Sequence, residues 1–221
     1  MTIDTLINKQ DNAEIVRDMI GAILAAEVVS QMALAVAASE DPLLWKLRIY
    51  TERSNPWEQF LNNPTDTSPL VNVWWDNSNF EMAASNIVER QKATAIFNLD
   101  CYGYAVAADE AAGGHKPGDR EAAFEAQRAV RLVRNILMAA EYTYLSLRGV
   151  VWRRWISGIT NFQPPQEPTT VQQISGSRIA FQVEFNELSP QITEETLELL
   201  TVDVMRAEDG QLIVETDYDY M

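Results

Sequence analysis

The residue types that most often carry out chemistry are scarce in this chain of 221 residues. Its only histidine, His115, lies in the run GGHKPG. A zinc site needs several His or Cys ligands close together. Residue counts alone leave a Ser-His-Asp triad open, but no G-x-S-x-G run is present to expose a serine nucleophile. Gly113–Gly114 lacks the residues that complete a phosphate loop or a dinucleotide fingerprint. We therefore predict no catalytic residue, no cofactor and no metal.

The remaining candidates for chemistry are one cysteine and several acidic pairs. Cys101 lies in a strand-like run and is expected to be a small buried apolar residue. A single cysteine excludes an internal disulfide and fits a reducing compartment. Glu194–Glu195 and Glu208–Asp209 lie in polar, turn-like surroundings, whereas acid-base carboxylates need burial to shift their pKa. We expect these acids to be solvated, with residues 216–221 as an acidic tail.

Charge is distributed unevenly along the chain. The net charge is −15, which disfavours a protein that wraps nucleic acid, because phosphate contacts need Lys and Arg. The segment from Lys116 to Arg154 contains eight basic and four acidic residues. The segment from Glu184 onward contains eleven acidic residues and one basic residue, Arg206. The two regions are either solvated faces or complementary surfaces that meet in an assembly.

Arginines and tryptophans supply the candidate interface residues. Arginines recur at intervals of three in the helical run, which fits DNA contact, pairing within the helix or pairing between subunits. Two further arginines lie between two tryptophans, and Trp and Arg are enriched at interface hot spots. The alternative for the second group is a Trp-lined core with outward arginines. The predicted subunit-interface residues are Arg128, Arg131, Trp152, Arg153, Arg154 and Trp155.

Two helices are expected to position these residues. Apolar residues at spacings of three or four predict a long helix over 119–147, whose small residues near the start allow close approach of another backbone. Residues 150–159 either continue this helix after a kink or break it. A second helix begins at Asp11, with Glu14 completing a capping box. It is apolar nearly all round, so either the rest of the domain or a second subunit must cover it.

The N-terminal helix also raises the question of a membrane. Residues 19–38 are apolar, but they include Glu27 and Gln31 and lack flanking aromatic belts. Residues 1–10 have no basic segment followed by an apolar run and are expected to form a flexible arm rather than a signal peptide. We predict no membrane partner.

Alternating patterns predict strands over 44–52, 70–75, 92–104 and 178–187, and Asp209–Gly210 predicts a C-terminal hairpin. A short helix is expected from Pro56 to Leu61, and residues 189–200 fit either helix or strand. The predicted fold class is α+β. It is a single domain over 1–221, with a mixed or antiparallel sheet packed against the long helix and the N-terminal helix.

In layout the chain resembles the tail-terminator and neck proteins of tailed bacteriophages. The resemblance rests on LRIYTERSNPWEQF, PLVNVWWDNSNFE, ATAIFNLDCYGYA with the long helix after it, and SRIAFQVEFNEL. No invariant catalytic motif defines that family. The loop PPQEP and the segment after the hairpin have no counterpart in it.

The resemblance implies a non-enzymatic structural protein of the virion, assembled in the host cytoplasm. Such a subunit forms a ring, expected to be a hexamer, which caps the tail tube and joins it to the head connector. DNA passes through the lumen without sequence-specific binding. The alternatives are another phage connector or capsid-associated structural protein, or a small soluble enzyme or nucleic-acid-binding module.

Overall fold

A computed structural model of the protein describes residues 8–63, 65–81, 90–109, 115–165, 172–188, 199–205 and 212–219. Contacts divide the chain into a main unit, Asn8–Ser189, and a second unit made of Met1–Ile7 and Pro190–Met221. The main unit contains α1 (Asn12–Ala37), η1 (Pro42–Trp45), β1 (Arg48–Thr51), α2 (Glu58–Asn62), β2 (Leu70–Phe80), β3 (Arg90–Val106), β4 (Ala108–Asp109), β5 (His115–Lys116), α3 (Gly118–Leu137), η2 (Ala140–Tyr142), β6 (Val151–Phe162) and β7 (Gln172–Leu188). The second unit contains β8 (Leu199–Met205) and β9 (Leu212–Asp219).

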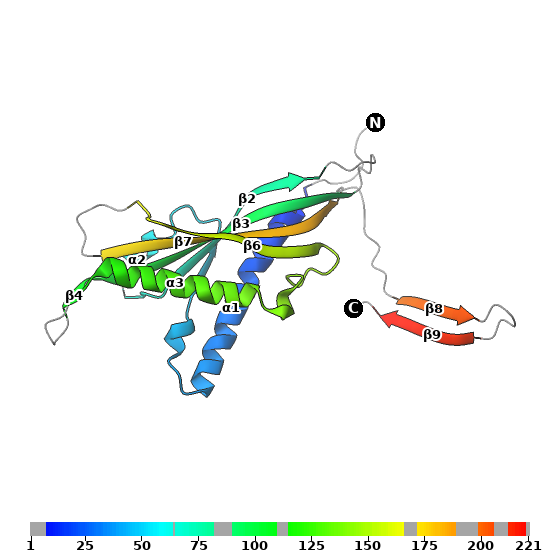
Figure 1. Cartoon of the computed structure of the whole chain (residues 1–221), viewed down its shortest axis with the longest axis horizontal. Coiled ribbons are helices and arrows are strands. Elements are labelled where there is room, and N and C mark those ends of the chain that lie inside the picture. The colour runs from blue at the N-terminus through cyan, green and yellow to red at the C-terminus, as the bar shows by residue number, and fades with distance from the viewer. Residues whose placement is uncertain are drawn as a thin grey trace. The chain divides into compact units, whose positions relative to one another are not determined.

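The main unit is built on a five-stranded mixed sheet of order β1-β2-β3-β7-β6 (Figure 1). The short β1 pairs parallel to β2, and the other neighbours pair antiparallel. The long strands β3 and β7 lie at the centre and pair from Arg90–Leu188 to Val106–Gln172 without a register shift. The α+β class, with a mixed sheet, an N-terminal helix and C-terminal strands, is thereby confirmed.

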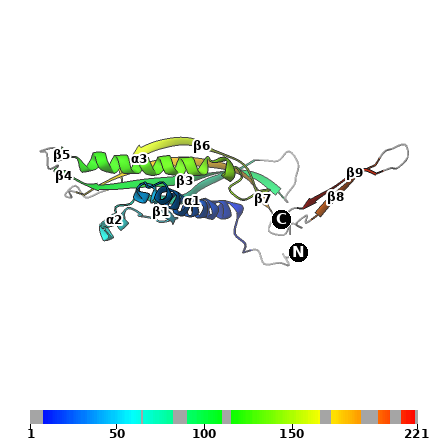
Figure 2. The same cartoon turned by 90° about the horizontal axis from the view of Figure 1, so that it is seen from below.

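Both long helices cover one face of this sheet (Figures 1 and 2). Alternate residues of β3 and β7, such as Phe97 and Phe181, point into a core that also takes Ile20 and Leu24 from α1. The start of α3 lies directly on β3. A Cβ added to Gly103 would lie 2.1 Å from the carbonyl oxygen of Ala122. The small residues at the start of this helix therefore allow close backbone approach, as predicted.

The opposite face of the sheet is only partly covered. The short helix α2 places Phe60 on it, stacked on Tyr104 with ring centroids 5.1 Å apart. Leu70, Tyr102 and Ile174 complete this second, smaller core. We call this side the open face, because among the described residues neither long helix packs on it.

The helix predicted over 119–147 is confirmed over 119–137 and wrong in its last third, since α3 ends at Leu137. Ala139 has a ψ of 144°, outside the helical range. Arg154 of β6 donates from Nε to the carbonyl oxygen of Tyr142 at 2.5 Å and from Nη2 to that of Ala139 at 2.7 Å. A continuous helix would use both carbonyls for its own hydrogen bonds. The turn instead returns the chain to the sheet, so that residues 151–162 form a strand.

Other boundaries differ less. The strand predicted over 44–52 is confirmed only over Arg48–Thr51, because Asp41 caps a 3-10 turn over 42–45. The other three predicted strands are present and longer, ending at Phe80, Val106 and Leu188. The predicted capping box is present, since the Glu14 carboxylate accepts from the backbone N–H of Asp11 at 3.1 Å.

The second unit is an antiparallel hairpin in which Leu200 pairs with Tyr218 and Val204 with Val214. The C-terminal hairpin is therefore found where the sequence predicts it, although its turn, residues 206–211, lies outside the described residues, as do residues 189–198. Of the predicted arm, residues 8–10 are exposed and have no regular structure. The domain boundaries of 1–221 stay a prediction.

Candidate functional site

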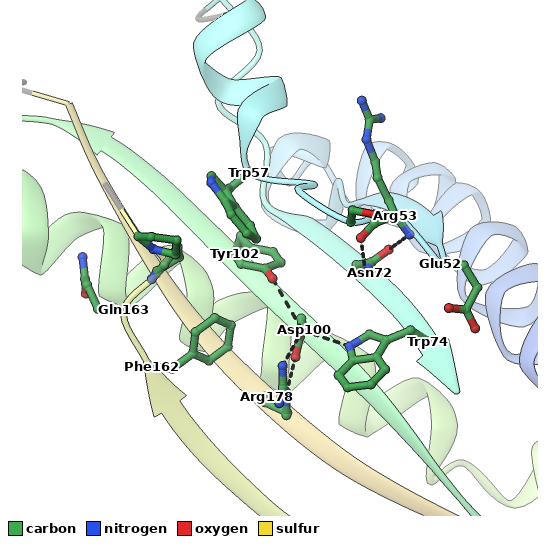
Figure 3. Close-up of a pocket in the computed structure, with 13 residues that line it drawn as sticks. Glu52, Arg53, Trp57, Asn72, Trp74, Asp100, Tyr102, Phe162, Gln163 and Arg178 are labelled. Carbon is green, nitrogen blue, oxygen red and sulfur yellow. Dashed lines mark hydrogen bonds and ion pairs between the residues drawn. The ribbon is translucent and has the colours of Figure 1, made fainter. Parts of the chain in front are cut away.

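The best-formed candidate site is a cavity of about 420 Å³ on the open face of the sheet. Its floor comes from the middle strands β2, β3 and β7, and its walls are the segment 52–57 before α2 and the segment 162–165 at the end of β6. We call it the Asp100 cavity, after the buried carboxylate at its centre (Figure 3). Asp100 is only 4% exposed.

Three side chains converge on this carboxylate (Figure 3). Arg178 donates from Nε to Oδ1 at 2.6 Å and from Nη2 to Oδ2 at 2.9 Å. The indole Nε1 of Trp74 donates to Oδ2 at 3.0 Å, and the hydroxyl of Tyr102 lies 3.5 Å from the same atom. Each partner comes from β2, β3 or β7. Register explains the meeting, because Asp100 pairs directly with Arg178 and with Asn72, two residues before Trp74.

Aromatic rings enclose the ion pair. The Arg178 guanidinium carbon lies 4.9 Å from the ring centroid of Trp74 and 5.4 Å from that of Phe162. Tyr102 contacts Phe162 edge-on and Trp57 at a tilt, both with centroids 5.6 Å apart. Such contacts restrict the rotamers of all these side chains. The site is therefore held in shape by the folded chain before any ligand arrives.

The wall before α2 is fixed by a side chain of the floor. Asn72 accepts from the backbone N–H of Arg53 and donates to the carbonyl oxygen of Arg53, both at 3.0 Å. Asn72 is itself buried. This pair of hydrogen bonds imitates a strand pairing and holds the segment 52–57 against β2.

The electrostatics suit binding rather than proton transfer. Burial and the neighbouring Asp100 raise the pKa of Tyr102 well above its ordinary value. The hydrogen bonds to Asp100 raise the pKa of Arg178, although burial opposes them. Both groups therefore keep their protons at neutral pH, and Asp100 is already occupied by hydrogen bonds. A general acid or base needs a pKa near the working pH.

The six predicted interface residues do not form one surface. Trp155 and Arg153 pair with Gln182 and Glu184 of β7, and the Arg153 guanidinium carbon lies 5.3 Å from the Trp155 ring centroid. Arg154 points to the helix-bearing side, where it holds the turn after α3. Trp152 is 53% exposed beside a register shift.

The two arginines predicted on the long helix also differ from each other. Arg128 pairs with Glu125 of its own helix and donates to the carbonyl oxygens of Leu43 and Leu44, the latter at 2.5 Å. Arg131 is exposed. Arg128 therefore joins α3 to η1 within the chain, and its role between subunits stays a prediction, as it does for the other five residues.

The histidine and the cysteine lie apart from the Asp100 cavity. His115 is exposed, with Nδ1 2.9 Å from a carboxylate oxygen of Asp109 in the adjacent strand. Cys101 is buried under α3, and burial raises its thiol pKa well above the ordinary value. Among the described residues no group of three or more His, Cys, Asp or Glu side chains is arranged to hold a metal ion.

A second feature is the apolar end of α1. The last third of this helix is covered only in part, since Ala35 is buried and Met32 packs against the core while most of the residues around them are exposed. The helix end and η1 expose large apolar side chains: Val29 by 69%, Leu34 by 59%, Val36 by 63%, Leu43 by 58% and Leu44 by 49%. We call these five residues the α1 tip. By length and composition α1 is also apolar enough to cross a membrane, although 33% of its most apolar window is buried in the main unit.

The Asp100 cavity was not foreseen from the sequence. In the sequence, Asp100 and Arg178 belong to two separate strand patterns, and each is a polar residue on the side opposite the apolar residues of its strand. Nothing in the sequence gives the register that places them opposite each other. The residue types alone, an acid and an arginine beside Trp74 and Phe162, were the available signal.

No protein-family model matches the chain, and a search of curated proteins finds no similar sequence.

Proposed function

We propose that this protein is a structural subunit of a tailed-phage virion. Copies of it form a homo-oligomeric ring that caps the tail tube and joins it to the head connector. The layout of helices and strands that suggested this family supports the proposal, since an α+β unit with two helices on one face of a mixed sheet is present. The observation that carries the assembly role is the α1 tip.

The α1 tip favours assembly because its apolar side chains surround the end of one helix. Val29 and Val36 lie about two turns apart, and Leu34 lies on another side of the same helix. Large exposed apolar patches mark sites of association, and five large apolar side chains are exposed at this end of α1 and in η1. Since the described part of the main unit leaves these side chains exposed, we take a second subunit or a neighbouring virion protein as their cover.

The hairpin of the second unit is compatible with the same role. A single two-stranded hairpin is marginally stable in water and needs further strands or a packed face. In its register Leu200 pairs with Tyr218, Val202 with Thr216 and Val204 with Val214, and the pairs between them are Thr201–Asp217 and Asp203–Glu215. A two-stranded segment of this kind suits a part of the chain that is stabilised on assembly.

The test is the state of association of the purified protein. Native mass spectrometry and negative-stain electron microscopy should show a closed ring, with six copies expected. Added tail tubes should then be capped at one end. A protein that stays monomeric at micromolar concentration would contradict the proposal. So would an enzymatic turnover, or a DNA affinity that falls steeply with salt. A ring that does not bind tail tubes would instead favour another connector or capsid-associated role.

A further inference from the structure

The Asp100 cavity holds a preorganised arginine with donor capacity left over. Nε and Nη2 of Arg178 are engaged by Asp100, whereas Nη1 makes no hydrogen bond or ion pair with any residue in the described part of the chain. The side chain is 38% exposed, against 5% for Asp100. An incoming ligand therefore meets the guanidinium while the carboxylate stays behind it. A planar guanidinium can donate to a carboxylate along each of two edges. Asp100 occupies one edge, so the other edge can bind a carboxylate of the ligand.

The walls offer flat apolar surface beside this donor. Trp57, Tyr102 and Phe162 form a continuous row of rings, and Pro164 and Pro165 continue the wall on the β6 side. Trp57 is only half-buried and borders the cavity (Figure 3). Aromatic rings stack with other aromatic rings at such spacings. The cavity volume of about 420 Å³ lies within the range of pockets that enclose small ligands.

We propose that the Asp100 cavity is a binding site for an aromatic ring that carries or adjoins a carboxylate. The ligand ring packs against the row formed by Trp57, Tyr102 and Phe162, and the carboxylate accepts from Arg178. This chemistry has two sources: a free aromatic acid, or a segment of a partner protein in which Asp and Tyr are neighbours. The inference does not depend on the ring-subunit proposal, since a monomer would bind either ligand.

Isothermal titration calorimetry with four probes tests the site. The probes are 4-hydroxyphenylacetate and the capped peptides DYDY, NYNY and DADA. We expect saturable binding of DYDY or of 4-hydroxyphenylacetate below about 1 mM. NYNY lacks the charge and DADA lacks the ring, so each should bind at least tenfold more weakly than DYDY. Binding of the free acid alone indicates a small-molecule site, and binding of the peptide alone indicates a protein partner.

Variants locate the binding in the cavity. Trp57→Ala removes a wall from the surface and should weaken binding at least tenfold, whereas Trp152→Ala, the matched change at an exposed tryptophan of β6, should leave it unchanged. Arg178→Lys keeps the charge but loses the planar fork, and it should also weaken binding, as Arg131→Lys on α3 should not. Thermal melts show whether each variant is folded, and Trp57→Ala decides the test if Arg178→Lys unfolds. No binding by any probe, or equal losses in site and control variants, would overturn the proposal.

Discussion

The α1 tip allows a quantitative test of assembly. We consider the double variant Leu34→Gln with Val36→Gln, because glutamine is neutral and forms helices well, so the change should not unfold α1. Full burial of a Val or Leu side chain contributes about 1.5–3 kcal/mol. Leu34 and Val36 are 59% and 63% exposed, so covering the rest contributes about 1–2 kcal/mol each. Their loss should therefore cost about 2–4 kcal/mol for each interface formed, or about 30- to 700-fold in affinity.

Sedimentation velocity over a range of concentrations measures this loss, and circular dichroism melts confirm that the subunit is folded. The matched control is Val106→Gln with Ile159→Gln, two apolar residues of strands that are 46% and 47% exposed. The control should assemble as the unchanged protein does. If the α1 variant assembles with unaltered affinity, or if the control loses as much, the tip is not the interface and the reasoning from exposure fails.

Five further changes test the fold, its pH dependence and the assembly. Gly103→Ala should cost about 3 kcal/mol or more in urea unfolding, since the new Cβ would lie 2.1 Å from a backbone oxygen of α3. Gly158→Ala meets nothing within 4 Å and should change stability by less than about 1 kcal/mol. Arg154→Glu should lower the unfolding free energy by about 2–4 kcal/mol, because a carboxylate would replace the guanidinium that donates to two backbone carbonyls. Arg153→Glu should stay folded and slightly weaken assembly, more at low salt than at high, as sedimentation at two salt concentrations would show. Although burial opposes it, hydrogen bonds from Ser68 and Lys46 lower the pKa of Asp66 to about 2 from 3.8. The stability that this lowered pKa contributes is present above pH 3.8 and is lost as the pH falls through 2. Asp66→Asn should therefore make the unfolding free energy less dependent on pH over that window.

Local patterns were enough to predict most strands of the sheet. The alternation of Phe97, Leu99 and Cys101, and that of Ile179 with Phe181, fixed which face is buried, and the structure agrees. The pattern works here because one face of the central strands lies under two helices and the other is partly wet. The ends were less predictable, since β3 and β7 continue beyond the predicted bounds by pairing with each other.

Residues 138–162 show why the rest could not be predicted. Tyr144 and Leu147 continue the helical spacing of α3, yet the chain leaves the helix at Met138. The tertiary contacts that decide this come from Arg154, beyond the predicted helix end. Leu145 and Ser146 even adopt positive φ values of 50° and 57°, which no local propensity favours. Contacts distant in sequence therefore override the local pattern.

The structure also indicates which of two contributions to assembly, surface charge or apolar contact at the α1 tip, is the larger. The basic region between Lys116 and Arg154 looked like a free positive surface, but Arg128 and Arg154 are bound to acceptors of their own chain. Arg120 lies over Phe124. Exposed ion pairs contribute about 0–1 kcal/mol each, whereas the five residues of the α1 tip offer about 5–10 kcal/mol of apolar burial before entropic costs. Apolar contact at the tip should therefore set the affinity of assembly, and the remaining surface charges should act on its rate and specificity.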